Sequence, residues 1–580
     1  MKLNKELNHT SSHLLAAAVL KHFPETKLGF GPATQEGFYY DFEFKEPISE
    51  NDLQKIEKTL KKMAAGGYKM IEDKNAQYSF DQKPYKKELY DEIIASGQKA
   101  TFYSLVNPAD GSVLFTDLCA GGHLESTASI KHVKLLSLAG AYWRGNSNNI
   151  QLTRIYGTAW ETQAELEEYL NILKERKERD HRKIGKELKI FSFNALSGQG
   201  MPIWLEDGMK IRNAIHKKVQ KWDRKYGFNE VLTPHFGEKE LYEISGHWQH
   251  YKDDMFSPIE VENELLVARP MTCPHHVLLY KAERRSYREL PIRYSELSRL
   301  YRYEKSGALT GLERVRSMDL TEGHIFARVD QIEKEFVHQY KLIKEVLDFF
   351  KIKVDYISFS KRDKSDKEKF FNDDQLWDKA EKALENVLKT LEIEYIEKEG
   401  EAAFYGPKID IQVRTVLGHE ITMSTLQLDF LLPQKFKMEY IDQNETKQIP
   451  VLIHRGLIGT YERFISILLE QTKGNLPFWM SPKQVVVIPV NYDLHHEYAQ
   501  KVHDKLFELG FHSEVDFRNE RINKKIREAQ MKKIKFQVII GDEELQNETL
   551  TYRKYGSNDS VNNISLAQFI DYLNNLKNEN

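Results

Sequence analysis

The sequence has 580 residues, of which 41% are hydrophobic and 29% charged, and its net charge is -3. This length allows about three or four domains, while the lack of an apolar run of about 18 residues and of a signal-peptide layout argues against a membrane span and a secretory leader. The two cysteines, Cys119 and Cys273, lie far apart in sequence, which excludes a disulfide scaffold and fits a reducing compartment. The slightly acidic balance means that a nucleic-acid partner would need local basic surfaces.

Residues 1–160 are predicted to form one α+β domain. An opening helix carries His9 and His13, which lie four residues apart and therefore share one helical face. The stretch VLFTDLCAGGH is typical of a strand that enters a Gly-rich loop, and it carries Cys119 and His123.

Residues 161–190 are predicted to form one connecting helix, whose basic face is either a solvated surface or a surface that touches nucleic acid. Residues 191–480 alternate strands and helices, and the predicted strands include VLTPHF, IRYSEL, KIDIQV and STLQLDF. This region has no GxGxxG or P-loop pattern, which argues against Rossmann-type and Walker-type nucleotide binding.

The segment RYEKSGALTGLERVRSMDLTEGH is predicted to be an antiparallel hairpin with a long Gly-containing loop. Arg302 stands at one end of this loop, and Arg314 and Arg316 stand at the other. Such arginines suit a polyphosphate, because each guanidinium can make two parallel, charge-assisted bonds to phosphate oxygens. For an arginine pair taken alone, a solvated charged hairpin is the alternative interpretation.

Cys273 in RPMTCPHH, His324 at the end of the hairpin and His454 in VLIHRGLIGTYERF form a second group of candidates. Their spacing matches no zinc finger, and each residue taken alone favours ordinary packing. Each nonetheless lies beside a candidate nucleotide-binding segment. One thiolate and two imidazoles would leave a tetrahedral Zn²⁺ with an open position, the arrangement of a site that binds a ligand.

Residues 481–580 are predicted to form a small alternating β/α domain from VVVIPV, an amphipathic helix, HSEVDF, a basic helix and FQVIIG. The basic helix, Arg521 to Lys535, suits contacts to the backbone and bases of RNA. A solvated basic helix is the alternative.

Motif by motif, nearly the whole chain resembles the class II aminoacyl-tRNA synthetases, and among them the bacterial-type threonyl-tRNA synthetases. YGFNEVLTP, ending at Pro234, is similar to motif 1 of the family, RYE with RVR to motif 2, and GLIGTYERF with Arg463 to motif 3. SGHWQHYKDDMF, PMTCP, AFYGPKID, STLQLDF and RDHRKIG are more specific markers. The resemblance implies an α+β multidomain protein with an α+β editing domain (1–160), a linker helix (161–190), a class II catalytic domain with an antiparallel sheet (191–480) and an α/β anticodon-binding domain (481–580).

The resemblance implies ATP-dependent attachment of L-threonine to tRNA(Thr) through a threonyl-adenylate. It also implies one Zn²⁺ per subunit bound by Cys273, His324 and His454, Mg²⁺ bound with ATP, a homodimer formed through motif 1, no membrane partner and a cytoplasmic location. Because the chain starts almost directly at the helix with His9, we do not expect the small N-terminal domain that the family usually has.

The resemblance also assigns roles to single residues. Arg302 is expected to hold the α-phosphate and the amino-acid carboxylate, and Glu304 to accept from the adenine amino group. Arg314 and Arg463 are expected on the γ-phosphate side, with Arg463 stacked on adenine. His247 matches a histidine implicated in transfer to the terminal ribose of tRNA, and a packing role is its alternative. The other expected residues of the amino-acid and ATP pocket are Met271, Met318, Glu322, Tyr405, Lys408, Thr425 and Gln427.

Two positions depart from the usual pattern of the family. Glu322 stands where an aspartate is usual, so the carboxylate is kept on a side chain that is one methylene longer. Leu320 and Met318 stand where some members carry a glutamine and an aromatic residue. These departures concern the details of the pocket rather than the reaction.

A second active site is expected on physical grounds. A site that requires a hydroxyl group discriminates against valine by a factor of roughly 10^4–10^5. Serine also has the hydroxyl and lacks only a methyl group, whose contacts contribute only about 1–3 kcal/mol of binding free energy. Hydrolysis of Ser-tRNA(Thr) is therefore expected, with histidines positioning water and the ribose. The expected editing residues are His9, His13, Lys86, Asp117, Cys119 and His123. The same set could ligate zinc; the resemblance favours a metal-free site, and zinc stoichiometry separates the two.

Three other functions compete with this interpretation. A regulatory RNA-binding relative without catalysis is disfavoured because the motif 2 and motif 3 arginines and the Cys/His/His set are all present. A seryl or prolyl synthetase is disfavoured by RPMTCP and the same set. A plain zinc hydrolase would not need the C-terminal β/α domain.

Overall fold

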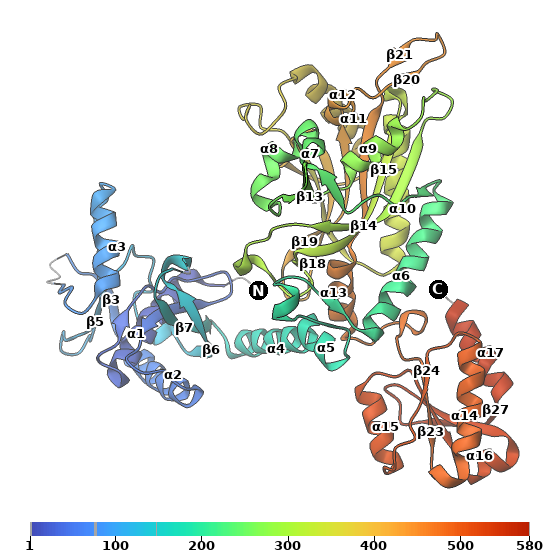
Figure 1. Ribbon diagram of the computed structural model, residues 1–580. Helices are drawn as coiled ribbons and strands as arrows, with labels where there is room; N and C mark the ends of the chain where they lie inside the picture. The colour runs from blue at the N-terminus through green and yellow to red at the C-terminus, as the bar shows by residue number, and fades with distance from the viewer. Residues whose placement is uncertain (1–2, 75–77, 147, 579–580) are drawn as a thin grey trace. The chain divides into compact units, whose positions relative to one another are not determined.

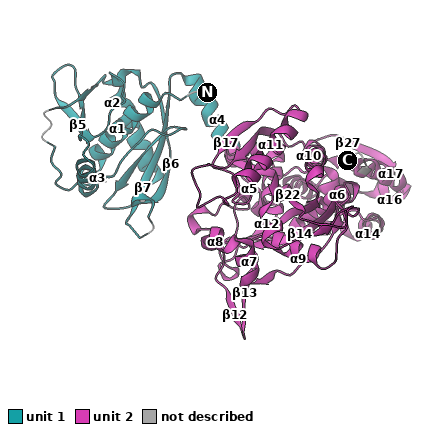
Figure 2. Cartoon of the chain, turned by 90° about the horizontal axis from the view of Figure 1, so that it is seen from above, with its two compact units in different colours: residues 1–175 teal, residues 176–580 magenta. Residues whose placement is uncertain are grey.

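The computed structural model describes residues 3–74, 78–146 and 148–578, and it divides into two compact units, residues 1–175 and 176–580 (Figures 1 and 2). The finer division into four domains stays a prediction. Within the part of the chain that the structure describes, every helix is too short or too polar to cross a membrane.

The first unit is an α+β structure in which two helices pack on an antiparallel sheet. Its helices are α1 (Lys5–His22), α2 (Glu50–Ala65) and α3 (Pro84–Ala95), and its strands are β1 (Lys27–Leu28), β2 (Phe38–Glu43), β3 (Lys69–Glu72), β4 (Phe102–Val106), β5 (Val113–Leu118), β6 (His132–Tyr142) and β7 (Gln151–Trp160). The main sheet runs β1-β2-β7-β6 and a smaller one runs β3-β4-β5. Helices α1 and α2 share a buried core with the main sheet. The Asn4 side chain caps α1 at Leu7 N (3.1 Å), so the helix carrying His9 and His13 starts as predicted.

The predicted single linker helix is wrong, because the chain forms two helices there. Helix α4 (Gln163–Arg179) ends just before Asp180, and α5 (His181–Glu187) begins after it. Asp180 adopts a non-helical backbone (φ -55°, ψ 115°), and its side chain accepts a bond from Arg182 N at 2.8 Å. An N-cap in this position starts a new helix and turns the chain.

The second unit is built on one large sheet. Its strands are β10 (Asn229–Glu230), β14 (Ile292–Tyr301), β15 (Ser317–Ala327), β16 (Val354–Lys361), β17 (Ile396–Glu399), β18 (Lys408–Arg414), β19 (Glu420–Asp429) and β22 (Val451–Thr460). The order is β10-β14-β15-β22-β19-β18-β16-β17, antiparallel except at its two edges. Strands IRYSEL, KIDIQV and STLQLDF lie in this sheet as predicted. Packed against it are α6 (Glu206–Lys225), α10 (Ile332–Phe349), α11 (Asp374–Thr390) and α13 (Tyr461–Thr472), which share its buried core.

The predicted strand VLTPHF is wrong over most of its length. Only Phe236 belongs to a strand, β11 (Phe236–Glu238), and that strand pairs in a separate small sheet with β13 (Glu264–Ala268) and β12 (Ile259–Val261). Pro234 has no N–H for a strand ladder, and the chain leaves one sheet for another around it. The remaining elements of this region are α7 (Lys239–Ser245), α8 (His247–Tyr251), α9 (Cys273–Lys281), α12 (Leu431–Lys435), β8 (Phe191–Ser192), β9 (Ile203–Trp204), β20 (Tyr440–Ile441) and β21 (Lys447–Gln448).

The C-terminal region is a mixed sheet with helices on it, as the alternating pattern predicts. Its strands β23 (Val485–Pro489), β24 (Ser513–Val515), β25 (Phe536–Ile540), β26 (Thr549–Lys554) and β27 (Ser560–Ser565) run in the order β24-β23-β25-β26-β27. Its helices are α14 (Tyr492–Glu508), α15 (Ile522–Met531), α16 (Asp542–Asn547) and α17 (Leu566–Asn578). The basic helix is shorter than predicted, because Lys533 takes a left-handed backbone (φ 58°) beyond its end. Lys525 is buried and donates to Asp516 O at 2.9 Å, so it does not belong to the basic surface.

Candidate active sites

The predicted hairpin is confirmed by strands β14 and β15, which pair antiparallel up to Tyr301 and Ser317 and leave residues 302–316 as a loop. Arg302 begins this loop and donates from Nε to Pro270 O at 3.2 Å. Arg314 donates from Nε to Glu304 Oε2 at 2.8 Å, so two predicted nucleotide-binding side chains face each other across the loop.

Arg463 lies at the start of α13, where the Thr460 side chain caps the helix by accepting from Arg463 N at 3.1 Å. Its guanidinium donates to Glu313 O at 3.2 Å, which connects the helix to the motif 2 loop. Burial lowers the pKa of Arg463, and the positive charges of Arg302 and Arg314 lower it further. The three guanidinium groups therefore repel one another, and an anionic ligand would relieve that repulsion.

Cys273, His324 and His454 come together as a buried triad, with donor atoms that all lie within 4.8 Å of one another. Cys273 opens helix α9, and the two histidines are directly opposite each other in the register of β15 and β22. Burial, aided by the carboxylates of Glu322 and Asp429, raises the pKa of the Cys273 thiol. Burial also lowers the pKa of His324, which keeps the imidazole neutral and able to ligate a metal.

Polar groups that the sequence interpretation missed hold the two histidines in place. Asp429 Oδ2 lies 3.0 Å from His454 Nε2, and His276 Nδ1 lies 2.8 Å from His324 Nδ1. His276 in turn lies 3.1 Å from Glu296 Oε2. Such outer partners fix the ring orientation of metal-binding histidines. The DF in STLQLDF and the HH in PMTCPHH contain Asp429 and His276, but only the fold reveals their contacts.

Four other predicted pocket residues form a chain on strands β18 and β19 and the loop before them. Lys408 and Thr425 both bond to Asp410, at 2.5 and 2.6 Å, and Gln427 donates to Thr425 Oγ1 at 3.1 Å. Tyr405 bonds to Gln427, and its ring stacks on that of His454 at 4.9 Å between centroids. These bonds therefore connect Lys408, a predicted catalytic residue of the amino-acid and ATP pocket, with the Cys273/His324/His454 triad. Asp410 is a further residue that the sequence interpretation missed.

The remaining predicted residues lie around this chain. Glu322 Oε1 is 3.5 Å from His324 Nε2, so the longer carboxylate reaches the triad. Met271 packs against the hydrophobic cluster that contains Cys273, and Met318 packs with Leu300 and Val315 in another cluster.

His247 is completely buried next to the triad. Its Nε2 lies 3.7 Å from Cys273 Sγ, and its Nδ1 lies 2.7 Å from Ser245 Oγ. Burial lowers the pKa of His247 to about 3, which keeps the ring neutral.

The second group of predicted residues meets in the first unit. His9, His13, Cys119 and His123 have donor atoms within 4.8 Å of one another, and Cys119 Sγ lies 3.1 Å from His123 Nε2. Burial lowers the pKa of His9 and His13, brings that of His123 to about 2 and raises that of Cys119 to about 11. The cluster therefore consists of neutral imidazoles and a protonated thiol.

A buried ion pair lies beside this cluster. Lys86 Nζ is 2.6 Å from Asp117 Oδ1, and the two side chains are 2% and 1% exposed. Tyr40, which the sequence interpretation missed, donates to Asp117 Oδ2 at 2.6 Å, and His13 Nδ1 lies 3.5 Å from the same oxygen. The six predicted editing residues thus form one connected group with Tyr40.

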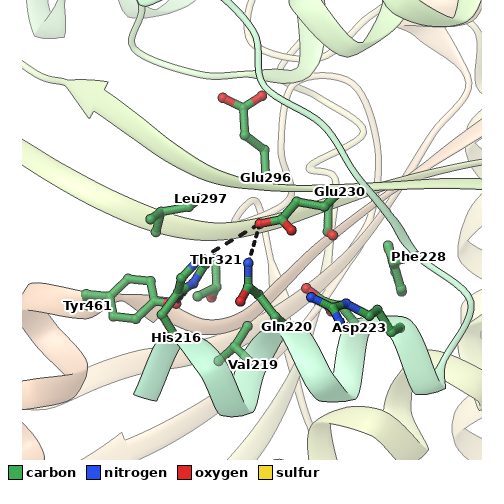
Figure 3. Close-up of a pocket in the computed structure, with 12 residues that line it drawn as sticks. His216, Val219, Gln220, Asp223, Phe228, Glu230, Glu296, Leu297, Thr321 and Tyr461 are labelled. Atoms are coloured by element: carbon green, nitrogen blue, oxygen red, sulfur yellow. Dashed lines mark hydrogen bonds and ion pairs between the residues drawn. The ribbon is translucent and has the colours of Figure 1, made fainter. Parts of the chain in front are cut away.

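The cavity drawn in Figure 3 lies between helix α6 and strands β14 and β15, and none of the predicted site residues lines it. Its volume of about 20 Å³ has room for about one water molecule. Glu230 accepts from Gln220 at 2.7 Å and lies 3.9 Å from His216 across it. The cavity is too small for a substrate.

Three family models match the chain: the tRNA synthetase class II core domain (G, H, P, S and T) at residues 256–472, the anticodon binding domain at 484–576, and the threonyl and alanyl tRNA synthetase second additional domain at 102–156. With the largely antiparallel sheet and its arginine loop, these matches define a class II aminoacyl-tRNA synthetase.

The relatives narrow the class further. The chain is 60% identical over 572 residues to a threonine–tRNA ligase of Mycoplasmopsis pulmonis, covering 99% of this chain and 96% of the relative. It is 47% identical over 570 residues to threonine–tRNA ligase 1 of Bacillus subtilis, covering 97% and 87%. The chain belongs to the threonine–tRNA ligase family. The crystal structure of the RNA binding domain of a threonyl-tRNA synthetase from Cryptosporidium parvum is similar over 68% of this chain and 98% of that chain, with 33% identity and a TM-score of 0.65.

These findings confirm the predicted family, fold class and enzyme class. They support tRNA, ATP and an amino acid as partners at the level of the family. The roles of single residues, the zinc ion and the dimer stay predictions.

Proposed function

We propose that this chain attaches L-threonine to tRNA(Thr) with ATP through a threonyl-adenylate, and that it hydrolyses Ser-tRNA(Thr) at a second site. The main observation in favour of the threonine-attachment activity is that a buried Cys/His/His triad shares a hairpin with an arginine-rich loop. The shared element is strand β15, which contributes His324 to the triad. This strand follows the loop directly, and the charge of Arg302 acts on the Cys273 thiol. A metal-binding group and a phosphate-binding group would then belong to one active site.

The triad suits zinc by the chemistry of its donors. A buried thiol and two imidazoles with converging donor atoms are ligands that zinc prefers, and they leave a fourth position open. A zinc ion held there would offer that position to the amine and hydroxyl of threonine. The buried Cys273 would then ionise, because the cation supplies the charge that burial otherwise opposes.

The chain's own residues would bind and orient ATP and threonine. Arg302 would hold the α-phosphate and the carboxylate together, which places the attacking oxygen next to phosphorus. Glu304 would turn from Arg314 to the adenine amino group, and that release leaves Arg314 free to join Arg463 at the terminal phosphate. Magnesium bound with ATP would neutralise further phosphate charge.

His247 is proposed as the base that receives a proton from the terminal ribose of tRNA. Its ring is neutral and has a lone pair, but a pKa of about 3 makes it a weak base unless bound tRNA changes its surroundings. A structural role beside Cys273 is the alternative, since the side chain is fully buried.

The cluster of the first unit is proposed as a metal-free editing site. Neutral imidazoles of His9, His13 and His123 can hold a water molecule and the ribose, while the Lys86–Asp117 ion pair lies beside His13. One zinc per purified chain supports this proposal. Two zinc ions per chain, with the second lost on replacing His13, would make the editing site a metal site instead.

The proposal is tested by ATP–pyrophosphate exchange with threonine, serine, valine and proline. We expect exchange with threonine, weaker exchange with serine and almost none with valine, because the site demands a hydroxyl. Exchange with proline alone, or with none of the four, would contradict the proposal. Release of serine from Ser-tRNA(Thr), and its loss in His13→Ala, tests the second site independently.

Dimer formation through the motif 1 segment that ends at Pro234 and a cytoplasmic location are part of the same proposal. Leu232 in this segment is 81% exposed and is therefore available to contact a partner subunit. Sedimentation of the native chain and of Leu232→Asp measures it: the variant should sediment as a monomer.

A further inference from the structure

His181, the histidine of RDHRKIG, joins three segments that are far apart in sequence. It is fully buried at the start of α5. Its Nδ1 lies 2.8 Å from Glu470 Oε1 near the end of α13, and its Nε2 accepts a bond from Leu312 N of the motif 2 loop at 3.0 Å. The linker thus contacts both elements that carry the proposed nucleotide-binding arginines.

The contacts define which nitrogen of His181 carries the proton. The backbone N–H of Leu312 can only donate, so Nε2 must present its lone pair. The proton is therefore on Nδ1, which donates to the Glu470 carboxylate. Both ring nitrogens are used, and neither role can be exchanged without losing one bond.

The anchored segments are the ones that hold Arg314 and Arg463. Leu312 is fully buried two residues before Arg314, and the next carbonyl, Glu313 O, accepts from Arg463 Nε at 3.2 Å. Arg179, just before α5, donates to Glu470 O at 3.1 Å and so binds the same end of α13. The loop and the helix are connected twice, through Arg463 itself and through the linker.

The close approach of the loop to His181 is a second, independent observation. Gly311 has a left-handed backbone (φ 50°), and a Cβ there would lie 2.2 Å from His181 Nε2 and 2.7 Å from Arg182 Cγ. The loop can contact the linker this closely only because residue 311 lacks a side chain.

We propose that His181 is a positioning residue for ATP: by joining Leu312 to Glu470, it holds the motif 2 loop against helix α13 so that Arg314 and Arg463 face one ligand. This inference rests on the proposed function, since it assumes that these arginines bind ATP. It assigns to the linker a larger effect on the nucleotide than on the amino acid, because His181 holds the loop at Leu312, near Arg314 and far in sequence from Arg302.

Two variants separate the two bonds. His181→Asn keeps a donor near the position of Nδ1 and loses the acceptor for Leu312 N, whereas His181→Gln keeps an acceptor near Nε2 and loses the donor to Glu470. In ATP–pyrophosphate exchange we expect His181→Asn to raise KM for ATP about tenfold and to leave KM for threonine within about twofold. His181→Gln should keep KM for ATP close to the native value, because it keeps the bond to Leu312 N and Arg179 still binds the linker to Glu470 O.

His495 provides a matched control. It is also buried, accepts from Asn491 N at its Nδ1 and lies 2.9 Å from Asp542 through its Nε2, but it belongs to the C-terminal region. His495→Gln removes the corresponding backbone acceptor and should leave both KM values unchanged. Equal KM for ATP in the two His181 variants, or a parallel rise of both KM values, would overturn the inference.

Deuterium exchange gives a readout that needs no activity. Amides of the loop around Leu312 should exchange about tenfold faster in His181→Asn than in His181→Gln. If the native chain shows no threonine-dependent ATP–pyrophosphate exchange, the proposed function is refuted. The deuterium exchange rates would still decide whether His181 anchors the loop. Identical loop exchange in both variants would refute the anchoring.

Discussion

Replacing Asp429 with asparagine tests how the sheet prepares His454 to bind a metal. Asp429 Oδ2 lies 3.0 Å from His454 Nε2, while Oδ1 accepts from Leu431 N and Leu432 N at 2.8 and 2.9 Å. Since a carboxylate only accepts, Nε2 carries the proton. The lone pair of Nδ1 is then directed towards His324, whose Nε2 is 3.1 Å away.

Asparagine keeps one oxygen and replaces the other with a donor. If the remaining oxygen stays on the backbone amides of α12, the new NH₂ group faces His454 Nε2 and favours the tautomer that has its proton on Nδ1. That tautomer cannot ligate a metal through Nδ1. Losing such an outer partner lowers metal affinity by about 10–100-fold, which corresponds to about 1.4–2.8 kcal/mol.

The assay is competition for Zn²⁺ between the purified chain and a chelator, with KM for threonine measured in parallel. Asp442→Asn is the control, because Asp442 also accepts from backbone N–H groups, at Asn444 and Thr446, in the turn between β20 and β21. We expect a loss of zinc affinity in Asp429→Asn only. Affinity within about twofold of the native chain, with unchanged melting, would refute the reasoning.

Two predictions concern the first unit. Lys86→Met should destabilise it by about 3–5 kcal/mol, because the buried Asp117 loses its cationic partner and retains the neutral Tyr40 hydroxyl. The double variant with Asp117→Asn should recover much of the melting temperature but not the deacylation of Ser-tRNA(Thr). A double variant no more stable than Lys86→Met would contradict this. In the folded chain, burial lowers the pKa of His13 and holds that of His123 near 2. In the unfolded chain, both histidines bind protons below about pH 6.5. Stability should therefore be greatest above this pH and fall below it by up to about 1.4 kcal/mol per pH unit for each histidine. Melting temperatures at about pH 7.5 and 5.5 measure this, and His123→Gln should lose less on acidification than the native chain.

Local sequence pattern was sufficient to predict those helices, turns and loops whose structure depends on neighbouring residues. The spacing of His9 and His13 placed both on α1, and the glycines between Arg302 and Arg314 predicted the loop between β14 and β15. The break at Asp180 could also have been found, since aspartate is a preferred N-cap. Lys525 follows Ile522 by three residues and precedes Ala529 by four, so the helical period places it on the apolar side of α15.

Contacts between distant segments could not be predicted from local pattern. Nothing near His454 in sequence indicates Asp429, and nothing near Lys86 indicates Tyr40. The convergence of Cys273 with two distant histidines came from the family resemblance, since their spacing matches no ligand pattern. The contacts of His181 were missed because its partners lie 131 and 289 residues away.

The register of β15 and β22 has a consequence for the order of folding. His324 and His454 are 130 residues apart and become neighbours only when these two strands pair residue for residue. A slip of one residue would turn every side chain of a strand to the opposite face. A metal bound by this triad would therefore not nucleate the domain as it does in a zinc finger. It would enter a sheet that has already paired correctly, so metal uptake during refolding would report the late completion of the central sheet.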